Sequence, residues 1–182
     1  MTHARALVLC ILFTLLPVGY SFAGAQEDEV YGSFEWFCLM NINKYDALPS
    51  LLEKIQAKQV PKQQADVVLG EQTGKAWYVK GDTSFLTDGG TCGVYSKKVS
   101  SQGVLDLLST HIRTRVLNRG KTGSHVETVF AASYASNVDE AKELHAIIFA
   151  TTNELESYPG IILNALPEKV LRKNGMTIPT WP

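Results

Sequence analysis

The stretch from Gly74 to Lys97 constrains the fold of this chain most strongly. It contains three short runs of aromatic and β-branched residues, separated by Gly81-Asp82 and Asp88-Gly89-Gly90. Glycine and aspartate tolerate the positive φ angles of tight turns, so the pattern predicts strands near 75–80, 84–88 and 91–97. These strands are expected to form the first part of an antiparallel sheet.

The N-terminus has the pattern of an export signal. Arg5 supplies a short basic region, residues 6–18 are almost wholly apolar, and Ala23-Gly24-Ala25 fits a signal-peptidase site. We expect residues 1–25 to be removed as a signal peptide. Cleavage after Ala23 is the alternative site, and an uncleaved membrane anchor is the competing interpretation. No later stretch is long and apolar enough to span a membrane, so a periplasmic or secreted location is predicted.

Two cysteines, Cys38 and Cys92, remain after this cleavage. In an oxidising compartment an isolated pair is most simply one disulfide, which would stabilise the fold by ~4 kcal/mol on the chain-entropy model. The alternative is two separate thiols, one of them a nucleophile. Loss of Arg5 moves the formal net charge from -1 to about -2, which argues against bulk nucleic-acid binding.

The mature chain is predicted to be one domain with a short N-terminal arm and an irregular C-terminal tail. Residues 26–32 are acidic and polar and are predicted to form a flexible arm. Residues 33–182 are predicted to form a single α+β domain, with an irregular C-terminal tail from Pro167 onward. The apolar residues of 33–40 belong to either a short strand or the first turns of a helix.

Apolar residues at helical spacing predict two main helices, at 46–58 and 101–117. Asp46 is expected to cap the first helix, Ser100 or Ser101 the second, and Gly120 suits the C-cap of the second. The apolar stripes of the two helices are Leu48, Leu51, Leu52 and Ile55 in the first, and Val104, Leu105, Leu108, Ile112 and Val116 in the second.

Three more strands are predicted in the second half of the chain. Residues 126–134 alternate with a period of two, which indicates a strand. Residues 144–152 are almost wholly apolar and indicate a buried central strand, with one helix over 138–152 as the alternative. Residues 161–166 follow a predicted turn. Together the elements predict an α+β fold, in which two main helices pack on an antiparallel sheet of five to six strands built from hairpins, with one disulfide.

The motifs of common enzyme classes are absent from the sequence. Gly120-Lys121-Thr122 imitates the end of a phosphate-binding loop, but Arg115 stands where the first glycine is required. His111, His125 and His145 lack the spacing of metal ligands, and we predict neither a metal nor a cofactor. Asp82 and Asp88 are explained by the turns in which they lie.

Basic residues dominate 97–121, and acidic residues dominate 139–156. Two solvated faces account for this asymmetry. The sharper hypothesis is that Arg113, Arg115 and Arg119, near the predicted C-terminus of the second helix, bind an anionic partner.

Phe34…Cys38 and Trp77…Cys92-Gly93-Val94 carry a resemblance. Over residues 34–116 the pattern resembles small exported proteobacterial proteins of unknown function. The resemblance implies a one-domain periplasmic or secreted protein, and it brings no catalytic residues with it.

These observations favour a non-catalytic exported binding or accessory module over an enzyme. Its partner is expected to be another exported protein or a component of the cell envelope. The candidate contact residues are Trp77, Tyr78 and Tyr95, beside the arginines at 113, 115 and 119. The alternatives are a small hydrolase whose site is assembled from dispersed residues around one of the histidines, and an immunity or inhibitor protein directed against an exported enzyme.

Overall fold

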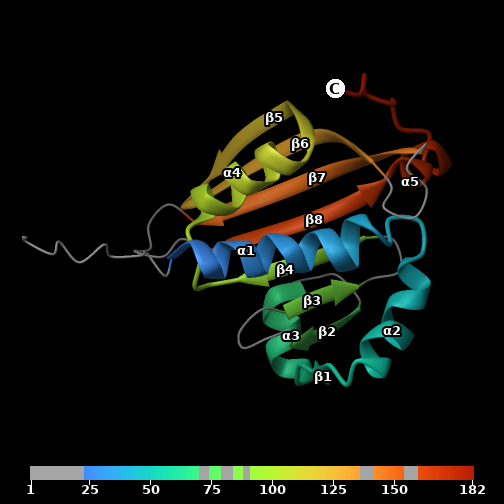
Figure 1. Ribbon diagram of the computed structural model, residues 1–182. Coiled ribbons are helices and arrows are strands. Elements are labelled where there is room, and N and C mark those ends of the chain that lie inside the picture. Colours follow the sequence, from blue (N-terminus) through green and yellow to red (C-terminus); the bar gives the residue numbers. More distant parts are fainter. Residues whose placement is uncertain (1–22, 70–73, 79–83, 88–90, 136–141, 154–159) are drawn as a thin grey trace, which may run out of the picture.

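The computed structural model describes residues 23–69, 74–78, 84–87, 91–135, 142–153 and 160–182 (Figure 1). The predicted leader lies outside these residues except for its last three positions. The predicted turns at 81–82, 88–90 and 158–159 lie outside them as well. The helical elements are α1 (Ala23–Ser33), the π-helix η1 (Phe34–Leu39), the 3-10 helix η2 (Tyr45–Ala47), α2 (Leu48–Lys54), α3 (Lys62–Leu69), α4 (Ser101–His111) and α5 (Glu168–Lys173).

Strands in the described residues form one antiparallel sheet with the order β1-β2-β3-β4-β8-β7-β6-β5. The predicted α+β class with an antiparallel sheet is therefore confirmed. The sheet has eight strands in this part of the chain, more than the predicted five or six, because β1 and β5 were not expected. The strands are β1 (Lys58–Gln59), β2 (Lys75–Tyr78), β3 (Ser84–Thr87), β4 (Cys92–Ser96), β5 (Arg113–Thr122), β6 (His125–Ala135), β7 (Glu143–Asn153) and β8 (Ile161–Pro167).

Two meanders meet in the middle of the sheet. Strands β1 to β4 follow one another across one half, and α4 then carries the chain to the far edge, where β5 begins. The second meander returns from β5 to β8, which pairs with β4. The buried strand predicted at 144–152 is confirmed as β7, between β6 and β8, and the alternative helix over 138–152 is wrong.

The N-terminal arm predicted at 26–32 is helical instead. These residues belong to α1, which continues directly into η1. Val30, Tyr31 and Phe34 are buried on one side of this helical segment and pack on the sheet. The polar residues that suggested an arm lie mostly on the other side. For residues 33–40, the helical alternative is the right one.

The helix predicted at 101–117 ends six residues early. Ser100 caps α4 as predicted, accepting a hydrogen bond from the Gly103 backbone N–H at 3.3 Å. Arg113 begins β5, which pairs along its length with β6. Cross-strand pairing there outweighs the helical pattern of apolar residues, so Val116 lies exposed on a strand and Gly120 lies within β5 rather than at a helix end.

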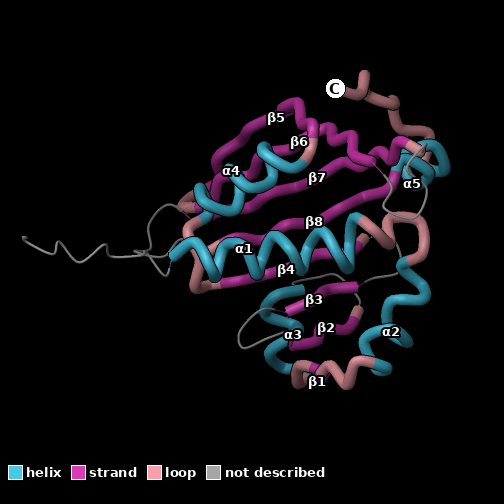
Figure 2. Tube along the Cα trace, viewed as in Figure 1, coloured by secondary structure: helices cyan, strands magenta, loops and turns pink. Residues whose placement is uncertain are grey.

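Helices α1 and α4 cover one face of the sheet (Figure 1). The main hydrophobic core lies between them and the strands, and the predicted Cys38–Cys92 disulfide lies in it with both residues fully buried and 5.3 Å between their Cα atoms. Strands β1 to β3 and helices α2 and α3 gather at one end of the molecule (Figure 2). The helix predicted at 46–58 is present there as η2 and α2, and the predicted Asp46 cap is absent.

The C-terminal part covers the opposite face of β6 to β8. Leu171 of α5 packs on Ala131 and Ile147, and Ile178 and Trp181 pack against the same cluster. The tail predicted to be irregular from Pro167 onward therefore begins with a helix, α5, whose apolar side is buried.

Candidate functional site

The aromatic residues and arginines predicted to bind a partner do not form one surface. Trp77 is 3% exposed and belongs to the main core, whereas Tyr78 and Tyr95 are half-buried. Trp77 and Tyr78 lie on β2, the second strand of the sheet, and the arginines lie on β5 at the far edge. The structure therefore separates the two halves of the predicted contact surface.

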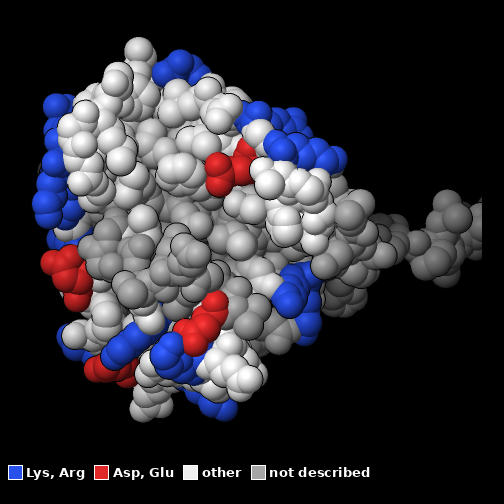
Figure 3. Space-filling view, turned by 180° about the vertical axis from the view of Figure 1, so that it is seen from behind, with Lys and Arg blue, Asp and Glu red and all other residues white. Residues whose placement is uncertain are grey.

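The three arginines do not all point to the same side of the sheet, because Arg113 and Arg115 share one face of β5 and Arg119 lies on the other. A β-bulge at Leu117 interrupts β5, so Arg115 lies opposite Ala131 whereas Arg119 lies opposite Thr128. Because 131 and 128 point to different faces of β6, the bulge directs Arg115 and Arg119 to opposite sides of the sheet. Arg113 pairs with Glu143, and Arg115 donates to the Thr180 carbonyl. On the face seen in Figure 3, Lys and Arg occur in separate groups around the rim.

The histidines named for a hydrolase lie in three different surroundings. His111 stacks on Tyr31 with 5.1 Å between ring centroids. His125 is the first residue of β6 and lies beside Ser124. His145 alone joins a charged cluster: its Nδ1 lies 3.1 Å from Glu168 Oε2, and the Trp181 ring stacks on it at 4.7 Å.

Ser133 brings a third residue type close to this cluster. It lies directly opposite His145 in the pairing of β6 with β7, and its Oγ is buried without a hydrogen-bond partner. Burial alone would raise the pKa of Glu168, but hydrogen bonds from His145 and Arg172 outweigh it and lower that pKa. Ser133 is only 1% exposed, and neither it nor His145 lines any of the described cavities. The arrangement supports a structural role for His145 more than a catalytic one.

The largest described cavity lies on the other side of the molecule, and we call it the α1–β1 groove. Its volume is about 570 Å³, against about 350 Å³ between α4 and strands β5 to β7 and about 170 Å³ beside the start of β8. It is lined by Asp28, Glu29, Gly32, Ser33, Trp36 and Phe37 from the α1–η1 segment, Ile55, Gln56, Ala57 and Lys58 between α2 and β1, and Tyr78 of β2.

Two large apolar side chains stand exposed on the walls of this groove. Trp36 of η1 is 58% exposed, and Ile55 at the end of α2 is 52% exposed. The sequence pattern places Trp36 in a short core segment and Ile55 on the buried stripe of a helix, and it indicates neither as a surface residue. Glu29, Gly32, Ser33 and Trp36 are spaced at i, i+3, i+4 and i+7. A helix over these residues places all four on one face, and this spacing is the sequence signal for the groove wall.

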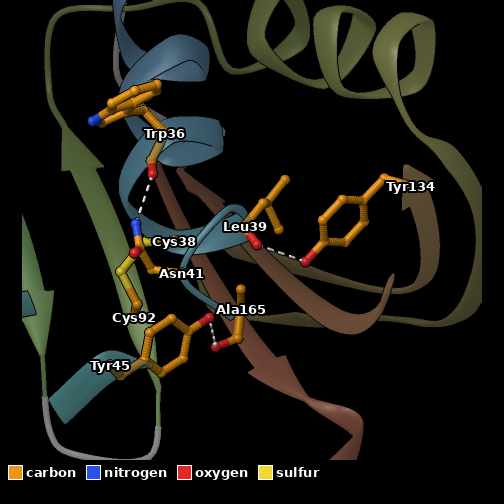
Figure 4. Close-up of a disulfide and its surroundings, with 8 residues drawn as sticks. All are labelled: Trp36, Cys38, Leu39, Asn41, Tyr45, Cys92, Tyr134 and Ala165. Carbon is orange, nitrogen blue, oxygen red and sulfur yellow. Dashed lines mark hydrogen bonds between the residues drawn. A yellow bond between two sulfur atoms is a disulfide. The ribbon is translucent and has the colours of Figure 1, made fainter. Parts of the chain in front are cut away.

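The wall that carries Trp36 is firmly attached to the core (Figure 4). The Trp36 carbonyl accepts a hydrogen bond from Asn41 Nδ2 at 3.0 Å, and the Leu39 carbonyl accepts one from the Tyr134 hydroxyl at 2.9 Å. Cys38 is joined to β4 by the disulfide. These contacts hold the segment while the Trp36 ring lies on the side of η1 turned away from Tyr134.

The opposite wall is fixed by the end of α2. Gln56 has a φ of +56°, the left-handed conformation that ends many helices, and Ala57 N–H donates to the Leu52 carbonyl at 2.9 Å. The turn leaves Ile55 at the rim of the groove. Both walls are therefore held in place by contacts within the chain itself.

The groove also contains an unsatisfied acidic group. Glu29 is half-buried, and its Oε1 is shielded from solvent with no hydrogen-bond partner among the described residues. Asp28 lines the same wall, and Lys58 lies on the other side. A shielded carboxylate oxygen without a donor is costly, so Glu29 would be stabilised by a donor in the groove toward which its carboxylate could turn.

The fold and the groove define an α+β protein in which a disulfide ties a helical segment to a continuous antiparallel sheet. No protein-family model, no curated protein and no solved structure matches the chain. In the described part of the chain, no helix is long and apolar enough to cross a membrane. Among those same residues, no group of three or more His, Cys, Asp or Glu is placed to hold a metal ion. The resemblance to small exported proteobacterial proteins stays a prediction.

Proposed function

We propose that the chain is an exported, non-catalytic binding protein whose α1–β1 groove holds a segment of a partner protein. The observation that carries the proposal is the exposure of Trp36 and Ile55 on the two walls of the largest described cavity. Tryptophan side chains contribute strongly to binding where a partner covers them. Exposed apolar side chains grouped at a groove are typical of binding sites, whereas isolated ones are common everywhere on protein surfaces.

The proposed location is the periplasm or the extracellular space. A buried disulfide is typical of proteins that fold in an oxidising compartment, and the leader pattern at residues 1–25 agrees with export. The partner is then another exported protein or a component of the cell envelope. An immunity or inhibitor role is the special case in which that partner is an exported enzyme.

Site-specific photo-crosslinking tests the proposal. A photoreactive residue at Ile55 is expected to give a discrete adduct with one protein from an envelope extract of the producing cells. The same group at Leu117, an exposed position on the far edge of the sheet, is the matched control and is expected to give none. Trp36→Ala should reduce the Ile55 adduct at least about tenfold, because truncating an interface tryptophan costs on the order of 2 kcal/mol. Equal labelling from both positions, or none from either, would overturn the proposal.

Hydrolysis is the second candidate function, and one observation favours it. Ser133 lies opposite His145 in the pairing of β6 with β7, His145 contacts Glu168, and the Ser133 hydroxyl has no hydrogen-bond partner among the described residues. Such an enzyme would need Trp181 to leave the His145 ring before substrate could enter. Labelling of Ser133 by a fluorophosphonate probe, lost in Ser133→Ala and in His145→Ala, would favour this function over binding in the groove.

A further inference from the structure

We infer that the α1–β1 groove accepts a lysine or arginine side chain from an otherwise apolar segment of the partner polypeptide. This inference rests on the proposed binding function and names the chemistry of its ligand. Three features of the groove carry it: an acidic group without a donor, an exposed indole, and an open space between them.

The acidic group is Glu29. Its Oε1 is shielded from water and accepts no hydrogen bond in the described structure, and Asp28 adds a second negative charge to the same wall. A cationic side chain in the groove would be attracted to this negatively charged wall, and a turn of the Glu29 carboxylate would let it accept a charged hydrogen bond, which is stronger than a neutral one. An anionic or purely apolar ligand would leave the oxygen unsatisfied.

The indole lies two helical turns further along the same wall. Trp36 follows Glu29 by seven residues, and the residues between them at helical spacing, Gly32 and Ser33, also line the groove. A basic side chain combines a charged end with an aliphatic stem. Its charge can meet Glu29, while its stem and neighbouring apolar residues cover Trp36 and Ile55. An exposed indole also attracts cations through its ring face.

The open space between them is provided by Gly32. A Cβ added at this position would meet nothing within 4 Å, so packing within the chain does not require glycine there. Glycine inside a helix is less favourable than alanine by about 1 kcal/mol. Gly32 therefore costs stability and leaves a channel from Glu29 to Trp36, as a long side chain lying along the helix would require.

Lys58 is the charged group that opposes this assignment. It lines the other wall, is exposed, and makes no hydrogen bond with Glu29 in the described structure. Its repulsion should weaken binding of a basic side chain without preventing it, because an exposed lysine can turn into solvent. Lys58→Met should accordingly strengthen the binding of a basic ligand.

Two-dimensional NMR titrations with short probe peptides test the inference on the mature protein. The probes are acetyl-Ala-Leu-Xaa-Leu-Ala-amide, with Xaa as lysine, arginine, norleucine or glutamate. We expect the lysine and arginine peptides to shift amide signals of residues 32–36 and 55–58, with affinity about tenfold above that of the norleucine peptide, a difference of 1.4 kcal/mol. The glutamate peptide should bind most weakly.

Variants separate the charge effect from the shape of the groove. Glu29→Gln should abolish the preference for the basic peptides and leave norleucine-peptide binding intact, whereas Glu53→Gln, at an exposed carboxylate of α2 outside the groove, should change neither. Gly32→Leu should block all four peptides. The NMR spectrum of Gly32→Leu should remain that of the folded protein, because leucine favours helix and its Cβ would have no atom within 4 Å.

The outcomes distinguish this inference from the proposed function. Equal affinity for the basic and norleucine peptides would overturn the assignment of a basic ligand, while the cross-link from Ile55 could still support the groove as a binding site. Binding of n-butylammonium as tight as that of the lysine peptide would overturn it too, since the site would then serve a small free amine. Loss of the Ile55 cross-link would instead remove the proposed function itself.

Discussion

Gly160 stands at a position where no other residue fits the backbone. Its φ is +62°, and an added Cβ would lie 2.6 Å from the Ser96 carbonyl oxygen. Gly123, in the turn between β5 and β6, has nearly the same φ of +61° but has nothing within 4 Å of an added Cβ. Comparing Gly160 with Gly123 therefore separates the free-energy cost of a left-handed backbone from that of a steric overlap.

Gly160→Ala should therefore destabilise the protein more than Gly123→Ala. The left-handed conformation costs an alanine about 1 kcal/mol at either position. The overlap with the Ser96 backbone should bring the loss in free energy of unfolding for Gly160→Ala to about 3 kcal/mol. Urea denaturation of both variants measures the difference. Equal losses would show that the close approach to Ser96 has no energetic weight.

At the scale of elements, charged contacts add to the apolar packing that attaches α5 and the C-terminal tail to the sheet. Glu168 at the start of α5 contacts His145 of β7 and Arg172 one turn later, and Trp181 of the tail stacks on His145. Arg115 of the edge strand donates to the Thr180 carbonyl. The half-buried Glu168 carboxylate thus joins α5 to β7, and His145 of β7 in turn contacts the tail.

Glu168→Gln should lower stability at neutral pH, and the loss should disappear in acid. The pKa of Glu168 is lowered in the folded state, so its stabilising effect is present above the ordinary value of 4.5 and is lost as the pH falls through the lower folded value. We expect a loss of up to about 1 kcal/mol at pH 7, because the contacts are partly exposed. Urea midpoints of wild type and variant from pH 7 to pH 3 should converge. Glu53→Gln is the control, and a constant difference across this range would contradict the prediction.

At the scale of the whole molecule, the two meanders meet along β4 and β8, and the disulfide ties the N-terminal helical segment to β4. The main core includes residues from both meanders and from α1, η1 and α4. The N-terminal segment is therefore part of the folding unit and not an attached arm. Even Glu27, near the start of this segment, is buried. Its carboxylate accepts a hydrogen bond from the Ser100 backbone N–H at 2.9 Å.

Cleavage of the predicted leader after Ala25 should leave this segment, from Gln26 onward, in the mature protein. Purified from the periplasm or medium, it should have the mass of residues 26–182 less two hydrogens, and it should show no free thiol until it is reduced. Reduction should lower the free energy of unfolding by ~4 kcal/mol. A mass that includes the leader would contradict the predicted cleavage, and two reactive thiols before reduction would contradict the disulfide. Mass spectrometry and thiol titration measure both.

Local patterns in the sequence determined much of the sheet. Tight-turn residues around 81–82 and 88–90 delimited β2, β3 and β4, and the period of two located β6. The predicted leader and the count of two remaining cysteines together indicated the disulfide. The strands and turns depend on residues close together in the chain, and two cysteines allow only one pairing with each other. Both features can therefore be predicted before any tertiary contact is known.

Tertiary contacts decided the remaining features. Residues 113–117 carry a helical pattern, yet hydrogen bonding with β6 made them a strand, and the bulge at Leu117 then separated Arg115 from Arg119. Residues 26–32 look polar and free, yet Val30 and Tyr31 bury one side of a helix. Trp36 looks like a core residue, yet the disulfide and the Tyr134 contact face the other side of η1 and leave the indole exposed at the groove. Which side of a segment is buried depends on what packs against it, and only the assembled sheet provides that partner.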